Sequence, residues 1–250
     1  MAKGDTQWVA GIHAVRTALK HGAERVDEIL LESKRQDRRF KQLIEEAKAA
    51  GVSITQSDKK TLDRLAEGAN HQGVVASTRA PAARNESDLD DLLTSLSEPA
   101  FILVLDGVTD PHNLGACLRT ADATGVHVVI APRDKSCGLT PVACKVASGA
   151  VESVPFVQVT NLARTLRHLQ DAHHIFIVGA AGESDLSLFD ADLKGGLALI
   201  MGAEGQGMRR LTREHCDQLI KLPMAGSVES LNVSVATGVC LYEAVRQRNT

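Results

Sequence analysis

Short apolar runs alternate with helical segments after residue 99, and this alternation constrains the fold more than any other feature of the chain. The apolar runs are FILVL, VHVVIAP, HIFIVGAA, LALIMG and QLIKLPM, and the helical segments lie around residues 113–124, 140–148, 161–171, 208–215 and 231–247. This pattern predicts an α/β domain with a mainly parallel sheet covered by helices. Ligands of parallel sheets bind at the carboxyl ends of the strands, so we expect the site residues to follow the strands directly.

The first 81 residues predict a second, smaller α/β domain. Two segments, GIHAVRTALKHG and DRRFKQLIEEAKAAG, place apolar residues at helical spacing, and a glycine ends each of them. Extended runs lie between and after these helices, in VDEILLES, VSITQ and GVVASTR.

An acidic segment, AARNESDLDDLLTSLSEP, separates the two predicted domains. It contains one arginine and five acidic residues, and SDLDDLLTSLS within it predicts a short helix. An ordinary solvated connection explains this composition. We therefore expect one domain over residues 1–81, a linker over 82–99 and a second domain over 100–250.

The composition of the chain excludes several classes of protein. The five cysteines are an odd number without a C-x-x-C pair, and the N-terminus lacks a secretory apolar region, so we expect free thiols and a cytoplasmic location. No apolar stretch approaches the roughly 18 residues that a membrane span needs. The histidines and cysteines show no metal-ligand spacing, so we expect no metal site, and we interpret His173 and His174 as the start of a strand.

Charge is distributed unevenly along the chain. The net charge of −3 gives no overall signature of nucleic-acid binding, yet residues 1–81 carry 14 Lys or Arg against 11 Asp or Glu. The segment KRQDRRF brings four of these cations together: Lys34, Arg35, Arg38 and Arg39. This cluster is either a solvated face or a patch that contacts nucleic-acid phosphates.

Three segments of the second domain carry polar residues directly after predicted strands. In DPHNLGACLRTA, Asn113 is a plausible helix N-cap, and Arg119 follows it on the same helix. In LIMGAEGQGM, the glycines reverse the order of a dinucleotide fingerprint, and Glu204 is a candidate functional carboxylate. In SVESLNVSVATG, Ser230 is predicted to cap the last helix and Asn232 to lie in its first turn, with small residues after them that favour close packing.

These segments resemble the three motifs of the SpoU family, which belongs to the knotted SPOUT methyltransferases. NLGACLR, MGAEGQGM with IKLPM, and SVESLNVSVATG match the family in order and spacing, and the resemblance covers roughly residues 99–248. It implies a Rossmann-like parallel sheet with a deep trefoil knot. The first domain is similar to the family's substrate-binding module, which is related to the L30e and L7Ae RNA-binding fold.

The resemblance also implies an activity. The chain is most similar to the branch that transfers a methyl group from S-adenosylmethionine to the ribose 2′-hydroxyl of a guanosine in the P loop of 23S ribosomal RNA. Members of the family are homodimers, and the substrate is either free RNA or a large-subunit assembly intermediate. A transfer-RNA ribose or another ribosomal site is the alternative target, and an inactive RNA-binding protein is an alternative of another class.

Site residues follow from the family motifs. The cofactor is expected at Gly179, Gly202, Leu222, Met224 and Leu231, and the catalytic group is expected to comprise Arg119, Asn113, Glu204, Ser230 and Asn232. A ribose hydroxyl is a poor nucleophile at neutral pH, so the site must supply alignment and proton removal. A guanidinium keeps its proton, which favours a gripping role for Arg119 over that of a literal base. We expect Glu204 to pair with Arg119 and Cys117 to be a small packing residue.

Overall fold

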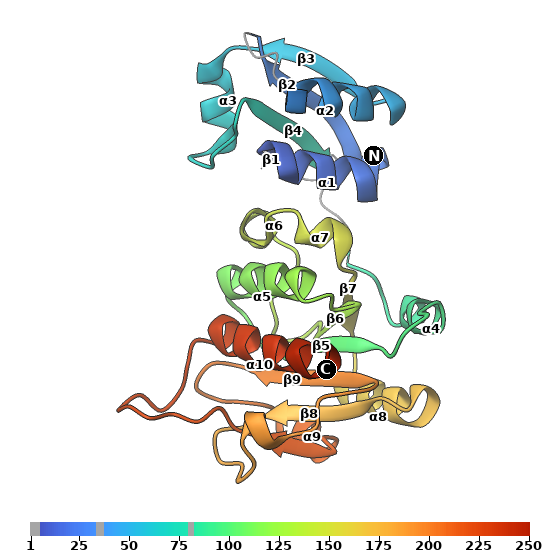
Figure 1. The fold of residues 1–250 in the computed structure, drawn as a ribbon, viewed down its shortest axis with the longest axis vertical. Coiled ribbons are helices and arrows are strands. Elements are labelled where there is room, and N and C mark those ends of the chain that lie inside the picture. The colour runs from blue at the N-terminus through green and yellow to red at the C-terminus, as the bar shows by residue number, and fades with distance from the viewer. Residues whose placement is uncertain (1–5, 34–37, 80–82) are drawn as a thin grey trace. The chain divides into compact units, whose positions relative to one another are not determined.

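The chain divides into two compact units, which we describe separately. One unit comprises residues 1–82 with 148–153, and the other comprises residues 83–147 with 154–250. The computed structural model describes residues 6–33, 38–79 and 83–250 (Figure 1). No helix within these ranges is both long and apolar enough to span a membrane.

The first unit is built on a mixed sheet with the strand order β1-β4-β2-β3. Strand β4 (Val74–Arg79) lies between β1 (Thr6–Ala10) and β2 (Val26–Glu32) and is antiparallel to both. Strand β3 (Ser53–Ser57) extends the sheet parallel to β2. The three strands that the sequence predicts here are confirmed, whereas β1 was not predicted.

Helices cover both faces of this sheet. On one face, α1 (Ile12–Gly22) and α2 (Arg38–Ala49) bury the apolar residues of the two predicted helices against β2 and β4. On the other face, α3 (Lys59–Ala66) packs Leu62 and Ala66 against Leu30 and Val75. A short 3₁₀ helix, η1 (Ala23–Arg25), joins α1 to β2, and α7 (Ala150–Ser153) belongs to the segment that groups with this unit.

The second unit contains a parallel sheet with the strand order β10-β8-β9-β5-β6-β7, as the alternation of apolar runs and helices predicts. The central strands are β5 (Phe101–Asp106) and β9 (Leu197–Gly202), and they pair over their whole length from Phe101 with Leu197 to Asp106 with Gly202. The remaining strands are β6 (Val128–Pro132), β7 (Phe156–Val159), β8 (Phe176–Ala180) and β10 (Gln218–Ile220).

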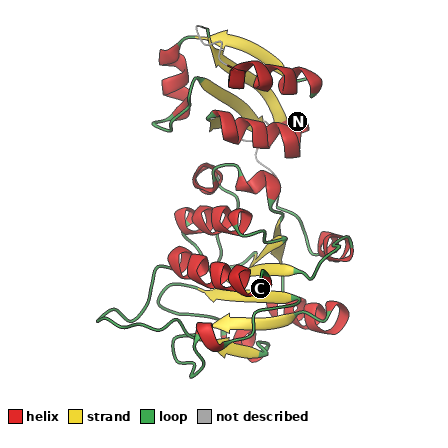
Figure 2. Cartoon of the chain, in the orientation of Figure 1, coloured by secondary structure: helices red, strands yellow, loops and turns green. Residues whose placement is uncertain are grey.

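Helices lie on both faces of the parallel sheet (Figure 1). Helices α4 (Ser87–Thr94) and α8 (Leu162–His173) bury their leucines against one face, while α5 (Pro111–Ala123) and α10 (Val233–Arg248) pack against each other on the opposite face. The short elements are α6 (Pro141–Ala147), η2 (Leu188–Asp190) and α9 (Arg210–Glu214). Figure 2 shows the long loops of this unit extending beyond the arrowheads of β8 and β9, where the carboxyl ends of these strands lie.

Close packing of α5 against α6 explains a glycine in the middle of α5. A Cβ on Gly115 would lie 2.5 Å from the carbonyl oxygen of Ala143 and 2.7 Å from the Cβ of Val146, so a side chain has no room. Gly238 of α10 differs, because a Cβ there would meet only the Thr120 Cγ2 at 3.8 Å. The close packing that the small residues of this segment favour is therefore not required at Gly238 within one chain, as far as the described residues show.

One predicted element boundary is wrong. His173 is the last residue of α8, and His174 is its C-cap in the left-handed conformation, so these residues end a helix instead of beginning a strand. The cap satisfies two carbonyls of the last turn through the His174 amide, and β8 begins only at Phe176.

Candidate active site

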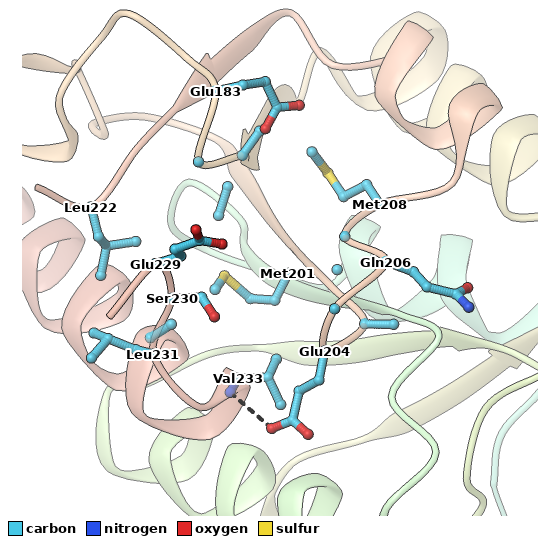
Figure 3. A pocket seen from close by; sticks show the side chains of 18 of the residues that line it. Glu183, Met201, Glu204, Gln206, Met208, Leu222, Glu229, Ser230, Leu231 and Val233 are labelled. Atoms are coloured by element: carbon cyan, nitrogen blue, oxygen red, sulfur yellow. Dashed lines mark hydrogen bonds between the residues drawn. The ribbon is translucent and has the colours of Figure 1, made fainter. Parts of the chain in front are cut away.

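The loops that follow β8, β9 and β10 enclose a cavity of about 680 Å³ together with the start of α10 (Figure 3). Its apolar lining comes from all of these segments and comprises Ala180, Ala181, Met201, Ala203, Met208, Leu222, Met224, Leu231, Val233 and Ala236. The cavity lies at the carboxyl edge of the parallel sheet, where the sequence pattern places the site. Its size and apolar lining are typical of a small-molecule site.

Most of the predicted cofactor residues line this cavity. Gly202, Leu222, Met224 and Leu231 are part of the lining, whereas Gly179 is not. A Cβ on Gly179 would lie 2.7 Å from both the Cys216 Sγ and the Met208 Cε, so this glycine makes room for Cys216 and for Met208, which itself lines the cavity.

The glycines of the loop after β9 form a tight return of the chain. The amide of Ala203 donates to the carbonyl of Gly207 at 3.0 Å, and the amide of Gly207 donates back at 2.9 Å. A Cβ on Gly202 would lie 2.3 Å from the Gly207 carbonyl carbon, and both Gly205 and Gly207 have positive φ. Close crossing of the backbone therefore explains this glycine pattern.

Three of the predicted catalytic residues meet at one edge of the cavity. The Glu204 Oε1 accepts hydrogen bonds from the Asn232 Nδ2 at 2.8 Å, the Asn113 Nδ2 at 3.2 Å and the Val233 amide at 3.4 Å. The Asn232 Nδ2 also donates to the Asn113 Oδ1 at 3.0 Å. One hydrogen-bonded cluster thus unites the three segments that were singled out in the sequence. Figure 3 shows Glu204 and Glu183 at opposite ends of the cavity.

The caps of the two helices differ from the sequence expectation. Asp110 caps α5 by accepting from the His112 amide at 2.9 Å, so Asn113 lies within the helix and its buried side chain is free to contact Glu204. Asn232 caps α10 through its Oδ1, which accepts from the Ser234 amide at 2.9 Å. Ser230 therefore lies in the loop, where it lines the cavity. Pro111 at the first turn of α5 explains the earlier start of that helix.

Arg119 lies apart from this cluster. It is exposed on α5, it does not line the cavity, and its guanidinium has no hydrogen-bond or ion-pair partner among the residues that the structure describes. The expected pairing of Glu204 with Arg119 is therefore wrong, because Arg119 lies on the exposed side of α5, whereas the Glu204 Oε1 accepts from Asn113, Asn232 and Val233. Six residues separate Arg119 from Asn113, which turns it about 240° around an ideal helix.

The charged residues of the cavity wall were not predicted from the sequence. Glu183, Glu229 and Arg213 line the cavity along with Glu204, and Arg213 forms an ion pair with Glu183. The position of Glu183 shortly after β8 is the sequence signal that could have identified it. With three carboxylates and one guanidinium, the cavity favours a ligand that carries positive charge.

Asp106 is a second residue that sequence reasoning missed. Its side chain is fully buried at the end of β5, and its Oδ2 accepts from the Arg209 amide at 2.8 Å. The Arg209 Nε lies 3.3 Å from the other carboxylate oxygen, and the same guanidinium donates to the carbonyl of Asp134 at 2.7 Å. These contacts hold the end of the loop that carries Glu204.

Two buried cysteines, Cys117 and Cys240, are poorly suited to act as nucleophiles. Cys117 is buried and donates to the Thr237 Oγ1 at 3.6 Å, and burial raises the pKa of its thiol to about 11. Burial likewise raises the pKa of Cys240 to about 12. Because the thiolate is the reactive form, these two residues are packing residues, as expected for Cys117.

Only part of the predicted basic cluster falls within the described residues. Arg38 and Arg39 are exposed at the start of α2, whereas Lys34 and Arg35 lie outside the described residues. The second unit contains none of these cations, so the cluster and the cavity belong to different units.

Two family models together match most of the chain. The model of the SpoU rRNA methylase family matches residues 100–242, which includes the cavity and the Asn113, Glu204 and Asn232 cluster. The model for RNA 2′-O ribose methyltransferase substrate binding matches residues 8–83.

Curated relatives match over nearly their full length. The 23S rRNA (guanosine-2′-O-)-methyltransferase RlmB of Haemophilus influenzae is 56% identical over 243 residues, which are 97% of this chain and 98% of that protein. The protein of the same name from Shewanella oneidensis is 59% identical over 242 residues, again 97% of this chain and 98% of that protein.

Solved structures are also similar to this chain. The SpoU methyltransferase AviRb from Streptomyces viridochromogenes, in complex with the cofactor AdoMet, is 27% identical with a TM-score of 0.76, over 97% of this chain and 90% of that chain. An AdoMet-bound rRNA methyltransferase from Sinorhizobium meliloti, 23% identical with a TM-score of 0.75 over 96% of this chain and 87% of that chain, shares the fold.

Proposed function

This chain belongs to the SpoU rRNA methylase family, and from that premise we propose that it is a 23S rRNA (guanosine-2′-O-)-methyltransferase that uses S-adenosylmethionine. The observation that carries this proposal is the identity of 56–59% to proteins of that activity, over nearly the full length of both chains. We place the guanosine in the P loop of 23S rRNA and the reaction in the cytoplasm. The substrate is the free RNA or a large-subunit assembly intermediate.

The cavity fits the cofactor. Met201, Leu222 and Leu231 supply apolar surface for an adenine ring, and Gly202 lines the same cavity. Glu183, Glu204 and Glu229 supply negative charge for the sulfonium and ammonium groups. When bound, S-adenosylmethionine supplies an electrophilic methyl group.

The residues of the cluster orient the ribose in this proposal. Asn113 and Asn232 fix the Glu204 carboxylate through hydrogen bonds of 3.2 and 2.8 Å, so its remaining oxygen is held in one direction toward an incoming hydroxyl. Ser230 lines the same cavity and adds a hydroxyl group. Such preorganised donors and acceptors align the 2′-oxygen before methyl transfer.

Arg119 is proposed to act on the RNA and not on Glu204. Its exposed guanidinium has no partner among the described residues, so it is available to a phosphate or to the 2′-oxygen. A guanidinium stays protonated, and a positive charge beside the hydroxyl favours loss of the hydroxyl proton. The role of Arg119 is thus electrostatic, and Arg119 does not itself accept the proton of the hydroxyl.

The first unit is proposed to be the RNA-binding domain, over residues 1–81, with the linker over 82–99 and the catalytic domain over 100–250. Its match to the substrate-binding family model supports this role, as do the exposed Arg38 and Arg39. Its mixed sheet with helices on both faces is compatible with the L30e and L7Ae relationship that the family implies.

We propose that residues 222–250 complete a trefoil knot. Two sets of contacts support this threading. Lys221 hydrogen-bonds Leu186 and Leu188 through its backbone, and Gln247 hydrogen-bonds Ala191 and Leu193. The loop between β8 and β9 is therefore hydrogen-bonded at two places along the chain that follows β10. Lys221 lies at the start of this C-terminal segment, and Gln247 lies near its end.

A homodimer is proposed on the exposed face of α10. Three large apolar or aromatic side chains lie along one face of this helix, at intervals of four and three residues. They are Val235, Val239 and Tyr242, which are 52%, 37% and 55% exposed. A contiguous apolar stripe of this kind is typical of a protein interface.

Mapping of ribose methylation in ribosomal RNA and in transfer RNA tests the proposed activity. A strain that lacks the gene is expected to lose one guanosine mark in 23S rRNA, and the wild-type gene is expected to restore it. An Arg119→Ala copy should not restore the mark, whereas its purified protein should bind S-adenosylmethionine with unchanged affinity. Arg164→Ala, which removes a cation from α8 on the opposite face of the sheet, is the matched control and should restore the mark. A complete set of marks in the deletion strain would refute the ribosomal target, and a lost transfer-RNA mark would identify the alternative one.

A further inference from the structure

Two histidines and a carboxylate meet on the face of the parallel sheet that α4 and α8 cover. The Asp90 Oδ1 of α4 lies 2.7 Å from the His168 Nε2 and 2.8 Å from the His173 Nε2, both of α8. The two imidazole rings are 5.6 Å apart between centroids and nearly perpendicular, at 86°. None of these residues lines the cavity described above, so the trio is separate from the proposed active site.

We propose that Asp90, His168 and His173 bind a divalent transition-metal ion of the zinc class. One potential ligand atom from each residue lies within 4.8 Å of the other two, and this is the group with that property among the described His, Cys, Asp and Glu residues. Imidazole nitrogens prefer zinc, cobalt, nickel and copper, whereas magnesium and calcium prefer sites made of oxygen ligands. Two imidazoles and one carboxylate therefore select the zinc class.

The geometry requires only a small rearrangement. Ligand atoms about 2.0–2.2 Å from a tetrahedral ion lie about 3.3–3.5 Å apart, so each nitrogen–oxygen distance must open by about half an ångström. The Asp90 and His168 side chains are 53% and 46% exposed, which leaves them room to move. On binding, the ion replaces the two hydrogen bonds to Asp90. Each neutral imidazole then carries its proton on Nδ1, so that Nε2 donates its lone pair to the ion, and water completes the fourth position.

The ion would join α4 to α8. Leu89 and Leu93 already pack α4 against the core, and Glu86 at the start of α4 accepts from the Thr160 amide at 3.1 Å. Asp90 lies one helical turn further along, so the metal strengthens the polar link that the hydrogen bonds of Asp90 already make between α4 and α8. Its role is structural, and binding should stabilise the folded state by an amount that rises with the logarithm of metal concentration above the Kd.

Metal titration of the full-length protein, with any affinity tag removed and after treatment with a chelator, tests this proposal. Co²⁺ and Zn²⁺ are titrated separately at pH 7.5, by absorption for Co²⁺ and by calorimetry for Zn²⁺, and thermal unfolding is followed with and without Zn²⁺. We expect one site per chain, visible cobalt bands, a higher thermal midpoint with Zn²⁺ and no response to Mg²⁺. His168→Gln and His173→Gln should each weaken binding at least about tenfold, as loss of a ligand does.

Matched variants separate a metal site from a general effect on folding. His127→Gln removes a histidine that pairs with a single carboxylate, Glu98, and should leave Zn²⁺ affinity unchanged. Asp90→Asn keeps the shape of the side chain and an acceptor oxygen, and should fold as the wild type does while it loses metal affinity. The proposal is overturned if the wild type binds neither ion, or if the two histidine variants bind them as well as the wild type.

Discussion

At the scale of single residues, Asp106 holds the loop that places Glu204 in the site. Its buried carboxylate accepts from the Arg209 amide at 2.8 Å and lies 3.3 Å from the Arg209 Nε. The amide and the Nε both belong to Arg209, which lies at the end of the loop that follows β9. A buried amide that loses its acceptor costs roughly 1–3 kcal/mol, and a buried carboxylate without its cation is also unfavourable.

Asp106→Ala should therefore lower the free energy of unfolding by about 1–3 kcal/mol, because the Arg209 amide is left unpaired. It should also weaken S-adenosylmethionine binding, since the loop lines the cavity. Urea unfolding and calorimetric titration measure the two effects. Asp134→Ala is the control, because Arg209 contacts the carbonyl of Asp134 and not its exposed carboxylate. Unchanged cofactor affinity in Asp106→Ala would argue against a positioning role.

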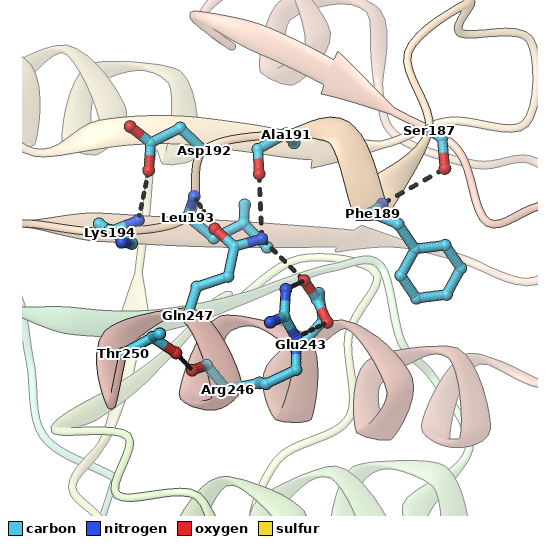
Figure 4. Close-up of polar contacts among 10 residues, drawn as sticks. All are labelled: Ser187, Phe189, Ala191, Asp192, Leu193, Lys194, Glu243, Arg246, Gln247 and Thr250. Atoms are coloured by element: carbon cyan, nitrogen blue, oxygen red, sulfur yellow. Dashed lines mark hydrogen bonds and ion pairs between the residues drawn. The ribbon is translucent and has the colours of Figure 1, made fainter.

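At the scale of elements, the last turns of α10 hold the loop between β8 and β9 (Figure 4). The Gln247 Nε2 donates to the carbonyl of Ala191 at 3.0 Å and to Glu243 at 2.8 Å, while its Oε1 accepts from the Leu193 amide at 2.9 Å. Hydrogen bonds from Arg246 and then from Gln247 lower the pKa of the Glu243 carboxyl to about 2. The ionised form of Glu243 is thus part of the folded structure.

This lowered pKa predicts how stability changes with pH. A carboxyl whose pKa is lower in the folded than in the unfolded protein stabilises the fold at pH values above its unfolded pKa of about 4.3. This contribution is lost as the pH falls toward the folded pKa of about 2. The difference in thermal midpoint between the wild type and Glu243→Gln should be constant above about pH 5 and shrink at lower pH. Thermal unfolding from pH 7 down to pH 3 measures it. Glu214→Gln, which removes an exposed ion pair with Arg210, should differ little from the wild type at any pH. A wild-type advantage that is as large at pH 3 as at pH 7 would contradict the assignment to Glu243.

At the scale of the whole molecule, the two units divide the charge. Residues 1–81 carry 14 basic against 11 acidic residues, while the rest of the chain carries 14 against 20. Most of the charged residues that line the cavity are acidic. This charge favours a positively charged cofactor and disfavours phosphate. This distribution is compatible with the proposal that Arg38 and Arg39 of the first unit contact RNA phosphates.

Replacing Arg38 and Arg39 with Gln should weaken binding to a 23S rRNA fragment and reduce the slope of log K against log salt by about 1–2, since each phosphate contact contributes about 0.7–0.9. S-adenosylmethionine affinity should not change. Filter binding at several salt concentrations and calorimetry measure the two quantities. Lys59 and Lys60, exposed at the start of α3, provide a control with the same change in charge. An equal loss in the lysine variant would show that overall charge, and not the Arg38 and Arg39 patch, attracts the RNA.

The local elements of this protein could be predicted from the sequence because their determinants lie close together in the chain. Apolar periodicity predicted the five runs that contain β5, β6, β8, β9 and β10, and glycine positions marked the tight loop after β9. Boundaries were less certain where two residues can serve one role. Asp110 and Asn113 are both capable caps, and Asn232 competes with Ser230, so the caps were assigned wrongly.

Only the tertiary structure decided which distant residues meet. The strand order puts β9 beside β5 and so brings Glu204 to Asn113, 91 positions earlier in the chain. The cap of α10 then adds Asn232, while Arg119 stays on the exposed side of α5. Asp90 and His168 are 78 positions apart, so spacing along the chain could not reveal that this carboxylate meets the two histidines. Periodicity reports which side of an element is buried, but the choice of neighbour depends on the crossover connections and on the packing of the whole sheet.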